Sequence, residues 1–170
     1  MQHIVNAFWQ IVLLRRGPDV LPDSAFLLWL TGALYALISI VIVMLIYGGE
    51  RAVLLLLADM ALIVAWATAV LTIYRVRPRL RQTVTALFGA GCFLQLLALP
   101  LSFDPDMGAQ QDWVMTLRAL GLLLILLWSV AVYGQIIARA ISRGAGIGVV
   151  LAVVYFVLNI ELAALLLPAN

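Results

Sequence analysis

Residues 25–47 read AFLLWLTGALYALISIVIVMLIY, a run without a single charged side chain. A helix needs about 20 apolar residues to cross the hydrocarbon core of a bilayer, which is about 30 Å thick. The run therefore predicts a membrane-spanning helix. Four further runs have the same character, at residues 52–74, 81–101, 113–138 and 145–167. The expected fold is an all-α, polytopic transmembrane bundle of five spans.

The composition also indicates a protein that lies in a lipid bilayer. Of 170 residues, 66% are hydrophobic and 11% are charged, whereas a soluble domain carries about 25% charged residues. This excludes a soluble enzyme, and the unbroken apolar runs exclude a membrane barrel, whose strands alternate. The single Cys excludes an internal disulfide, and the single His argues against zinc clusters and haem pairs. We expect no cofactor, no metal and no nucleic-acid partner.

The short connections between the spans predict one membrane domain, residues 1–170. Short loops force successive helices into antiparallel hairpins. Five spans also do not divide into two equal inverted halves, which argues against an alternating-access transporter unless the protein dimerises.

The arginines predict the orientation. Alternate loops hold seven arginines on one side, and on the other side Arg51 with four acids. The positive-inside rule places the first group in the cytoplasm. All ten basic residues are Arg, which suggests GC-rich codons and hence a bacterial inner membrane, with the N-terminus cytoplasmic and the C-terminus periplasmic or extracellular. The first group is Arg15, Arg16, Arg75, Arg77, Arg79, Arg139 and Arg143.

Residues 2–14 predict a separate amphipathic helix that lies in the membrane interface. Its apolar residues recur at helical spacing, opposite a polar stripe of Gln2, Asn6 and Gln10. We expect Gly17 to cap this helix and Asp23 or Ser24 to cap the first span. We favour a helix that orients the first span, with its arginines on anionic phospholipid. The alternative is a docking helix for a cytoplasmic partner.

Five polar residues fall at comparable depth inside the outer half of the predicted membrane. At 1.5 Å per residue, Asp59 lies ~12 Å in from Arg51, while Arg118 and Glu161 lie ~8–9 Å from their span ends. Gln95 and Asn159 lie at a similar depth. Ionisable groups in lipid are costly and suggest function.

Two carboxylates and one guanidinium leave several pairings open. Arg118 can hold one carboxylate bidentately, and the second can stay protonated, share Arg118 or bind a cation. We favour a structural ion-pair network over a proton or ion relay, or a headgroup site open to the outer leaflet.

Three further features are weaker candidates. Asp104, Asp106 and Asp112 offer oxygen ligands for a divalent ion, but a solvated turn is the favoured interpretation. Small-residue pairs predict close helix packing: Gly144 with Gly148, Gly134 with Ala138, and Gly89 with Gly91. One set of arginines either binds anionic lipid headgroups or only sets the topology: Arg15, Arg16, Arg75, Arg77, Arg79 and Arg81. For the loop at residues 75–81 the topology role is favoured.

The short amphipathic helix, the stretch Arg-Gly-Pro-Asp-Val-Leu-Pro at residues 16–22 and five spans with an outside C-terminus resemble the bacterial members of the Yip (Rab-interacting) five-span family. The resemblance implies a non-enzymatic membrane adaptor and carries over no functional residues.

The sequence therefore favours a small integral membrane scaffold or accessory subunit without enzymatic activity. Its expected partners are membrane lipids and either a membrane protein or further copies of itself. The alternatives are a proton or small-solute transporter that uses the intramembrane carboxylates, and a lipid-modifying enzyme with Asp59 or Glu161 as acid or base.

Overall fold

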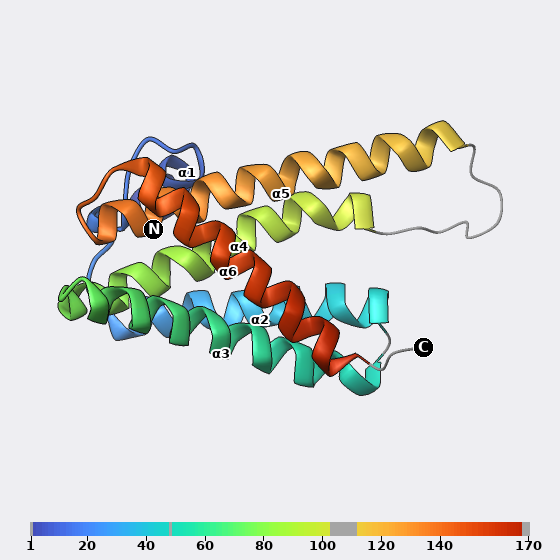
Figure 1. Ribbon diagram of the computed structural model, residues 1–170, viewed down its shortest axis with the longest axis horizontal. Helices are drawn as coiled ribbons and strands as arrows, with labels where there is room; N and C mark the ends of the chain where they lie inside the picture. The colour runs from blue at the N-terminus through green and yellow to red at the C-terminus, as the bar shows by residue number, and fades with distance from the viewer. Residues whose placement is uncertain (1, 48, 103–111, 168–170) are drawn as a thin grey trace.

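The structure is a computed structural model that describes residues 2–47, 49–102 and 112–167. It is an all-α bundle, and Figure 1 shows its helices in chain order. The elements are α1 (Gln2–Val12), η1 (Pro18–Val20), α2 (Ala25–Tyr47), α3 (Gly49–Ile73), η2 (Arg77–Arg79), α4 (Leu80–Ser102), α5 (Asp112–Ala140) and α6 (Ala145–Leu166).

The five long helices, α2 to α6, are long and apolar enough to span a membrane. They coincide with the five predicted spans, so the prediction of a polytopic all-α membrane protein is confirmed. Their outer surfaces carry large apolar side chains that soluble proteins bury: Trp29 is 79% exposed, Phe26 73% and Leu165 82%. Lipid is the solvent that such a surface requires.

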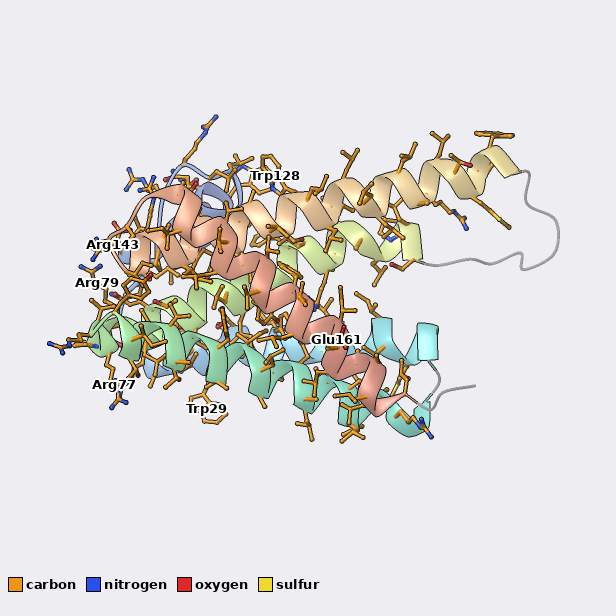
Figure 2. The ribbon with its side chains drawn as sticks, in the orientation of Figure 1. Trp29, Arg77, Arg79, Trp128, Arg143 and Glu161 are labelled. Atoms are coloured by element: carbon orange, nitrogen blue, oxygen red, sulfur yellow. The ribbon has the colours of Figure 1, made fainter. Side chains whose placement is uncertain are left out.

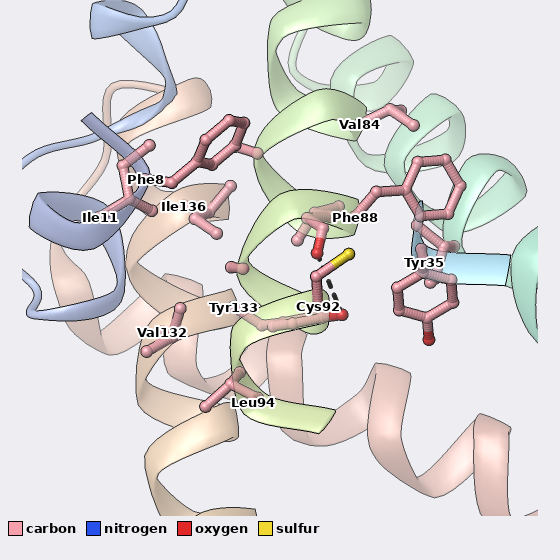
Figure 3. Close-up of a cluster of buried hydrophobic side chains, with 14 of the residues drawn as sticks. Phe8, Ile11, Tyr35, Val84, Phe88, Cys92, Leu94, Val132, Tyr133 and Ile136 are labelled. Atoms are coloured by element: carbon pink, nitrogen blue, oxygen red, sulfur yellow. Dashed lines mark hydrogen bonds between the residues drawn. The ribbon is translucent and has the colours of Figure 1, made fainter. Parts of the chain in front are cut away.

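The centre of the bundle is α4. Every residue from Thr83 to Cys92 is buried, because α2, α3, α5 and α1 all pack around this helix. Figure 3 shows part of the core, where α1 and α5 meet one side of α4, while Phe88 points toward Tyr35 of α2. The helices that surround α4 thus share one core.

Helices α5 and α6 make the closest approach. A side chain at Gly148 would overlap the carbonyl oxygen of Gly134 and lie 2.6 Å from the Cβ of Ala138. These residues belong to the small-residue pairs picked out in the sequence, whereas Gly144 has nothing within 4 Å of a built Cβ. From this contact α6 runs diagonally across the bundle, and its far end lies against α3 (Figure 1).

Helix α1 packs on α4 and α5 near the end of the bundle where α2 begins. Phe8 lies directly against Gly89, where a Cβ would overlap its ring. The indole Nε1 of Trp128 on α5 donates to the carbonyl oxygen of Val12 at 3.1 Å. The amphipathic helix therefore buries its apolar face against α4 and α5. Trp9 of the same helix remains 51% exposed.

The expected cap at Gly17 is wrong. Helix α1 ends earlier, because Leu14 takes a positive φ of 62° and the amide of Arg15 donates to the carbonyl of Gln10. Gly17 is extended, and its missing side chain leaves room for Arg139. At the start of α2, Ser24 Oγ accepts from the amide of Leu27 at 3.4 Å. Ser24 is thus the cap of the first span.

Candidate functional site

Asp59 on α3 accepts three hydrogen bonds from two neighbouring helices. Tyr35 Oη on α2 donates to Oδ2 at 2.6 Å. Asn159 Nδ2 and Tyr155 Oη, both on α6, donate to Oδ1 at 2.6 Å and 3.2 Å. This network, which we call the Asp59 network, joins α2, α3 and α6 through one carboxylate.

The donors are placed by helical spacing. Tyr155 and Asn159 are four residues apart, so they project from one face of α6. The same spacing on α2 puts Ser39 one turn beyond Tyr35. Ser39 Oγ donates to Gln95 Oε1 of α4 at 3.0 Å and accepts from its Nε2 at 2.7 Å. Four helices therefore bring polar side chains to one layer.

The tyrosine rings are held by aromatic packing. Tyr133 of α5 stacks on Tyr155 with ring centroids 5.5 Å apart, and its own hydroxyl donates to the carbonyl of Leu87 at 3.3 Å. Tyr35 lies 5.2 Å from Phe88, centroid to centroid. Contacts of this kind fix the rings, so the two hydroxyls are held in place against the Asp59 carboxylate.

A cavity of about 260 Å³ adjoins the network. Its polar lining comes from Tyr35, Ser39, Asp59, Gln95 and Asn159, and Asp59 is the one charged residue among the described residues that line it. Apolar residues from the first half of α3 and the second halves of α2 and α6 complete the wall: Ile42, Val43, Leu55, Leu56, Ala58, Leu162, Ala163 and Leu166. The cavity thus extends from the polar layer toward one end of the bundle.

The Asp59 carboxylate retains acceptor capacity. A carboxylate oxygen can accept two hydrogen bonds, and among the described residues Oδ1 receives two while Oδ2 receives one. One lone-pair position on Oδ2 is therefore left for a donor that enters the cavity. A cation or an N–H or O–H group of a small molecule would satisfy it.

The structure brings together three of the five predicted intramembrane residues. Asp59, Gln95 and Asn159 line the cavity, whereas Arg118 and Glu161 do not. Glu161 is exposed on α6 (Figure 2), and Arg118 is half-buried on α5. Among the described residues, one ion pair is closer than 4 Å: Arg81 Nη1 lies 3.9 Å from Asp23 Oδ1. The expected pairing of Arg118 with Asp59 or Glu161 is therefore absent.

The sequence interpretation missed Tyr35, Ser39 and Tyr155. A signal was present: in two spans, pairs of hydrogen-bonding side chains stand four residues apart, away from the span ends where Tyr usually lies. Because Tyr belongs to the hydrophobic class of residues, the pattern does not interrupt the apolar runs.

The arginines of residues 75–81, predicted either to bind lipid headgroups or to set the topology, follow the end of α3, whereas Arg51 lies in its first turn. Arg77 Nε donates to Thr72 Oγ1 at 2.8 Å, and Arg79 Nη1 donates to the carbonyl of Ala140 at 2.9 Å. Asp104 and Asp106 lie outside the described residues. In the part of the chain that the structure describes, no three His, Cys, Asp or Glu side chains gather into a group that could hold a metal ion.

Fold and site together define a multi-pass helical membrane protein with a carboxylate-lined cavity inside the bundle. No protein-family model, curated protein or solved structure matches the chain.

Proposed function

We propose that this chain binds a small polar solute, with cations preferred, in the cavity beside Asp59, and that it belongs to the transport class of membrane proteins. The observation that carries the proposal is the Asp59 carboxylate, which lines a cavity within membrane-spanning helices and keeps an acceptor position. Intramembrane carboxylates commonly mark ion, proton or substrate pathways.

The dimensions of the cavity restrict the solute. Pockets for drug-sized ligands measure about 300–1,000 Å³, and this cavity, at about 260 Å³, is smaller. It suits protons carried by water, inorganic cations and small amines. The Ser39–Gln95 pair supplies amide and hydroxyl groups beside the carboxylate for an uncharged part of the solute.

The test compares Asp59→Asn with Glu161→Gln, both in the purified chain. Each change replaces a carboxylate by its amide, but Glu161 lies outside the cavity. Thermal unfolding in detergent with added Na⁺, ammonium or methylammonium measures binding, and a pH-sensitive dye in liposomes measures proton flux. We expect Asp59→Asn to weaken binding or flux by about tenfold or more, and Glu161→Gln to leave both within twofold. Equal binding and flux in both variants would refute the proposal.

A second candidate is the scaffold or accessory subunit. It is favoured by one observation: the donors to Asp59 are side chains of the protein itself, so the network can act as a fixed link between α2, α3 and α6. The resemblance to the Yip family, which stays a prediction, agrees with it. In this case Asp59→Asn lowers the unfolding temperature without changing flux, and a stoichiometric partner protein co-purifies in native nanodiscs.

We further propose a bacterial inner-membrane location with the arginine-rich end in the cytoplasm. The support is the gathering of Arg77, Arg79 and Arg143 at one end of the bundle (Figure 2) and the positive-inside rule. A reporter fused after Asn170 should be active only outside the cytoplasm. Activity restricted to the cytoplasm would contradict this orientation.

A further inference from the structure

A second cavity, of about 460 Å³, lies at the arginine-rich end of the bundle. We call it the arginine pocket. It forms where η1, the start of α4 and the end of α5 meet, and it is separate from the cavity beside Asp59. Its polar lining includes Arg79, Arg139 and Arg143 together with Asp19, Gln82 and Ser142.

Arg79 is anchored in the pocket through one nitrogen. Its Nη1 donates to the carbonyl of Ala140 and to Ser142 Oγ, both at 2.9 Å, and to the carbonyl of Arg139 at 3.4 Å. These bonds cap the last carbonyls of α5. They leave Nη2 and Nε of Arg79 without a hydrogen bond to any described residue, on a guanidinium that is already held in one orientation.

The other two arginines are also positioned. The Arg143 guanidinium lies over the Tyr74 ring, 6.0 Å from its centroid. Arg139 Nη2 donates to the carbonyl of Arg15 at 3.4 Å. Ordered guanidinium groups lose less entropy when they bind a ligand.

The charge of the lining selects an anion. Three arginines face one carboxylate, Asp19, so the pocket has an excess of two positive charges. Guanidinium groups match phosphate oxygens bidentately. The pocket also lies where the spans end, which is the depth of the phospholipid headgroups.

From this geometry we infer that the arginine pocket binds a phosphate group, and that the phosphate of an anionic phospholipid is its ligand. The inference concerns the opposite end of the bundle from the Asp59 cavity and does not depend on the proposed function. Free phosphate shares the same chemistry, and the experiment separates the two sources.

The test compares Arg143→Gln with Arg77→Gln in the full chain. Arg143 lines the pocket. Its side chain makes no hydrogen bond to the described backbone, and its backbone amide, which donates to the carbonyl of Ala138, is kept in the Gln variant, so the substitution leaves the α5 cap intact. Arg77 carries the same charge at the same end but lies outside the lining. Native mass spectrometry and thermal unfolding measure binding of phosphatidylglycerol, cardiolipin, phosphatidylcholine and inorganic phosphate to each purified protein.

We expect the wild-type chain to bind phosphatidylglycerol and cardiolipin more tightly than phosphatidylcholine. Arg143→Gln should weaken anionic-lipid binding about fivefold, and Arg77→Gln less than twofold. If inorganic phosphate competes with the lipids at equal affinity, the pocket is a phosphate site, and the inference that a phospholipid is its ligand is overturned. Equal losses in the two variants, or no preference for anionic lipid, would overturn the site itself.

Discussion

Replacing Gly148 by Ala should force α5 and α6 apart. The added Cβ would overlap the carbonyl oxygen of Gly134 and lie 2.6 Å from the Cβ of Ala138 and 2.9 Å from the carbonyl carbon of Gly134. Two of these atoms belong to the backbone of α5. No change of rotamer can remove the overlap, so the helices themselves must move.

The size of the effect follows from comparing Gly148→Ala with Gly146→Ala. Added carbon atoms in a well-packed contact cost about 1–3 kcal/mol. Ala gains up to about 1 kcal/mol over Gly inside a helix, but this gain is common to both variants. A Cβ at Gly146 has nothing within 4 Å. The free energy of unfolding of Gly148→Ala should therefore lie about 1–3 kcal/mol below that of Gly146→Ala.

The assay is reversible unfolding of the purified chain in mixed micelles with increasing SDS, followed by tryptophan fluorescence and far-UV circular dichroism. Gly146→Ala should be at least as stable as the wild type. If Gly148→Ala proves as stable as Gly146→Ala, the backbone contact between α5 and α6 does not exist as described, and the reasoning fails.

Three further predictions concern single contacts. Tyr35→Phe removes one donor from Asp59 and should cost about 0.6–1.7 kcal/mol of unfolding free energy in the SDS assay; no loss would mean that this hydrogen bond does not contribute. Trp128→Phe removes the donor to the Val12 carbonyl and should speed hydrogen exchange in α1 several-fold, since a net hydrogen bond contributes about 1 kcal/mol; unchanged exchange would contradict the docking of α1. Cys92 is buried, so a membrane-permeant maleimide should label it only after unfolding, and rapid labelling of the folded chain would contradict its burial.

The fold was predictable because lipid imposes one strong rule on the chain. A segment that crosses the hydrocarbon core must be apolar and must pair its own backbone groups, and runs such as residues 25–47 show this directly. Helix ends are decided by weaker local forces. Leu14 ends α1 in a left-handed conformation that favours Gly, so the sequence pointed to Gly17 instead.

The site was only partly predictable because depth along a helix follows from counting residues, whereas direction around the bundle depends on packing. Counting placed Asp59, Gln95 and Asn159 in one layer, and they line one cavity. The same counting included Arg118 and Glu161. However, Glu161 points away from the Asp59 face of α6, and Arg118 lies on α5, which runs beside α4 and away from α3 (Figure 1).

The diagonal course of α6 couples the glycine contact to the Asp59 network. Eleven residues separate Gly148 from Asn159, or about 16 Å along the helix. A tilt of about 5° at Gly148 would therefore move Asn159 by about 1.4 Å. A displacement of this size along the hydrogen bond to Asp59, now 2.6 Å long, would stretch it to about 4 Å, beyond hydrogen-bonding range.

A double-mutant cycle tests this coupling. Asn159→Ala should cost about 0.6–1.7 kcal/mol of unfolding free energy in the wild-type chain and much less when Gly148→Ala is already present. Such a result would mean that the packing of two glycines at one end of the bundle sets the geometry of the carboxylate site nearer the other end. Equal costs in both backgrounds would show that α6 yields locally at Gly148, and that the Asp59 network holds the far half of the helix without help from that contact.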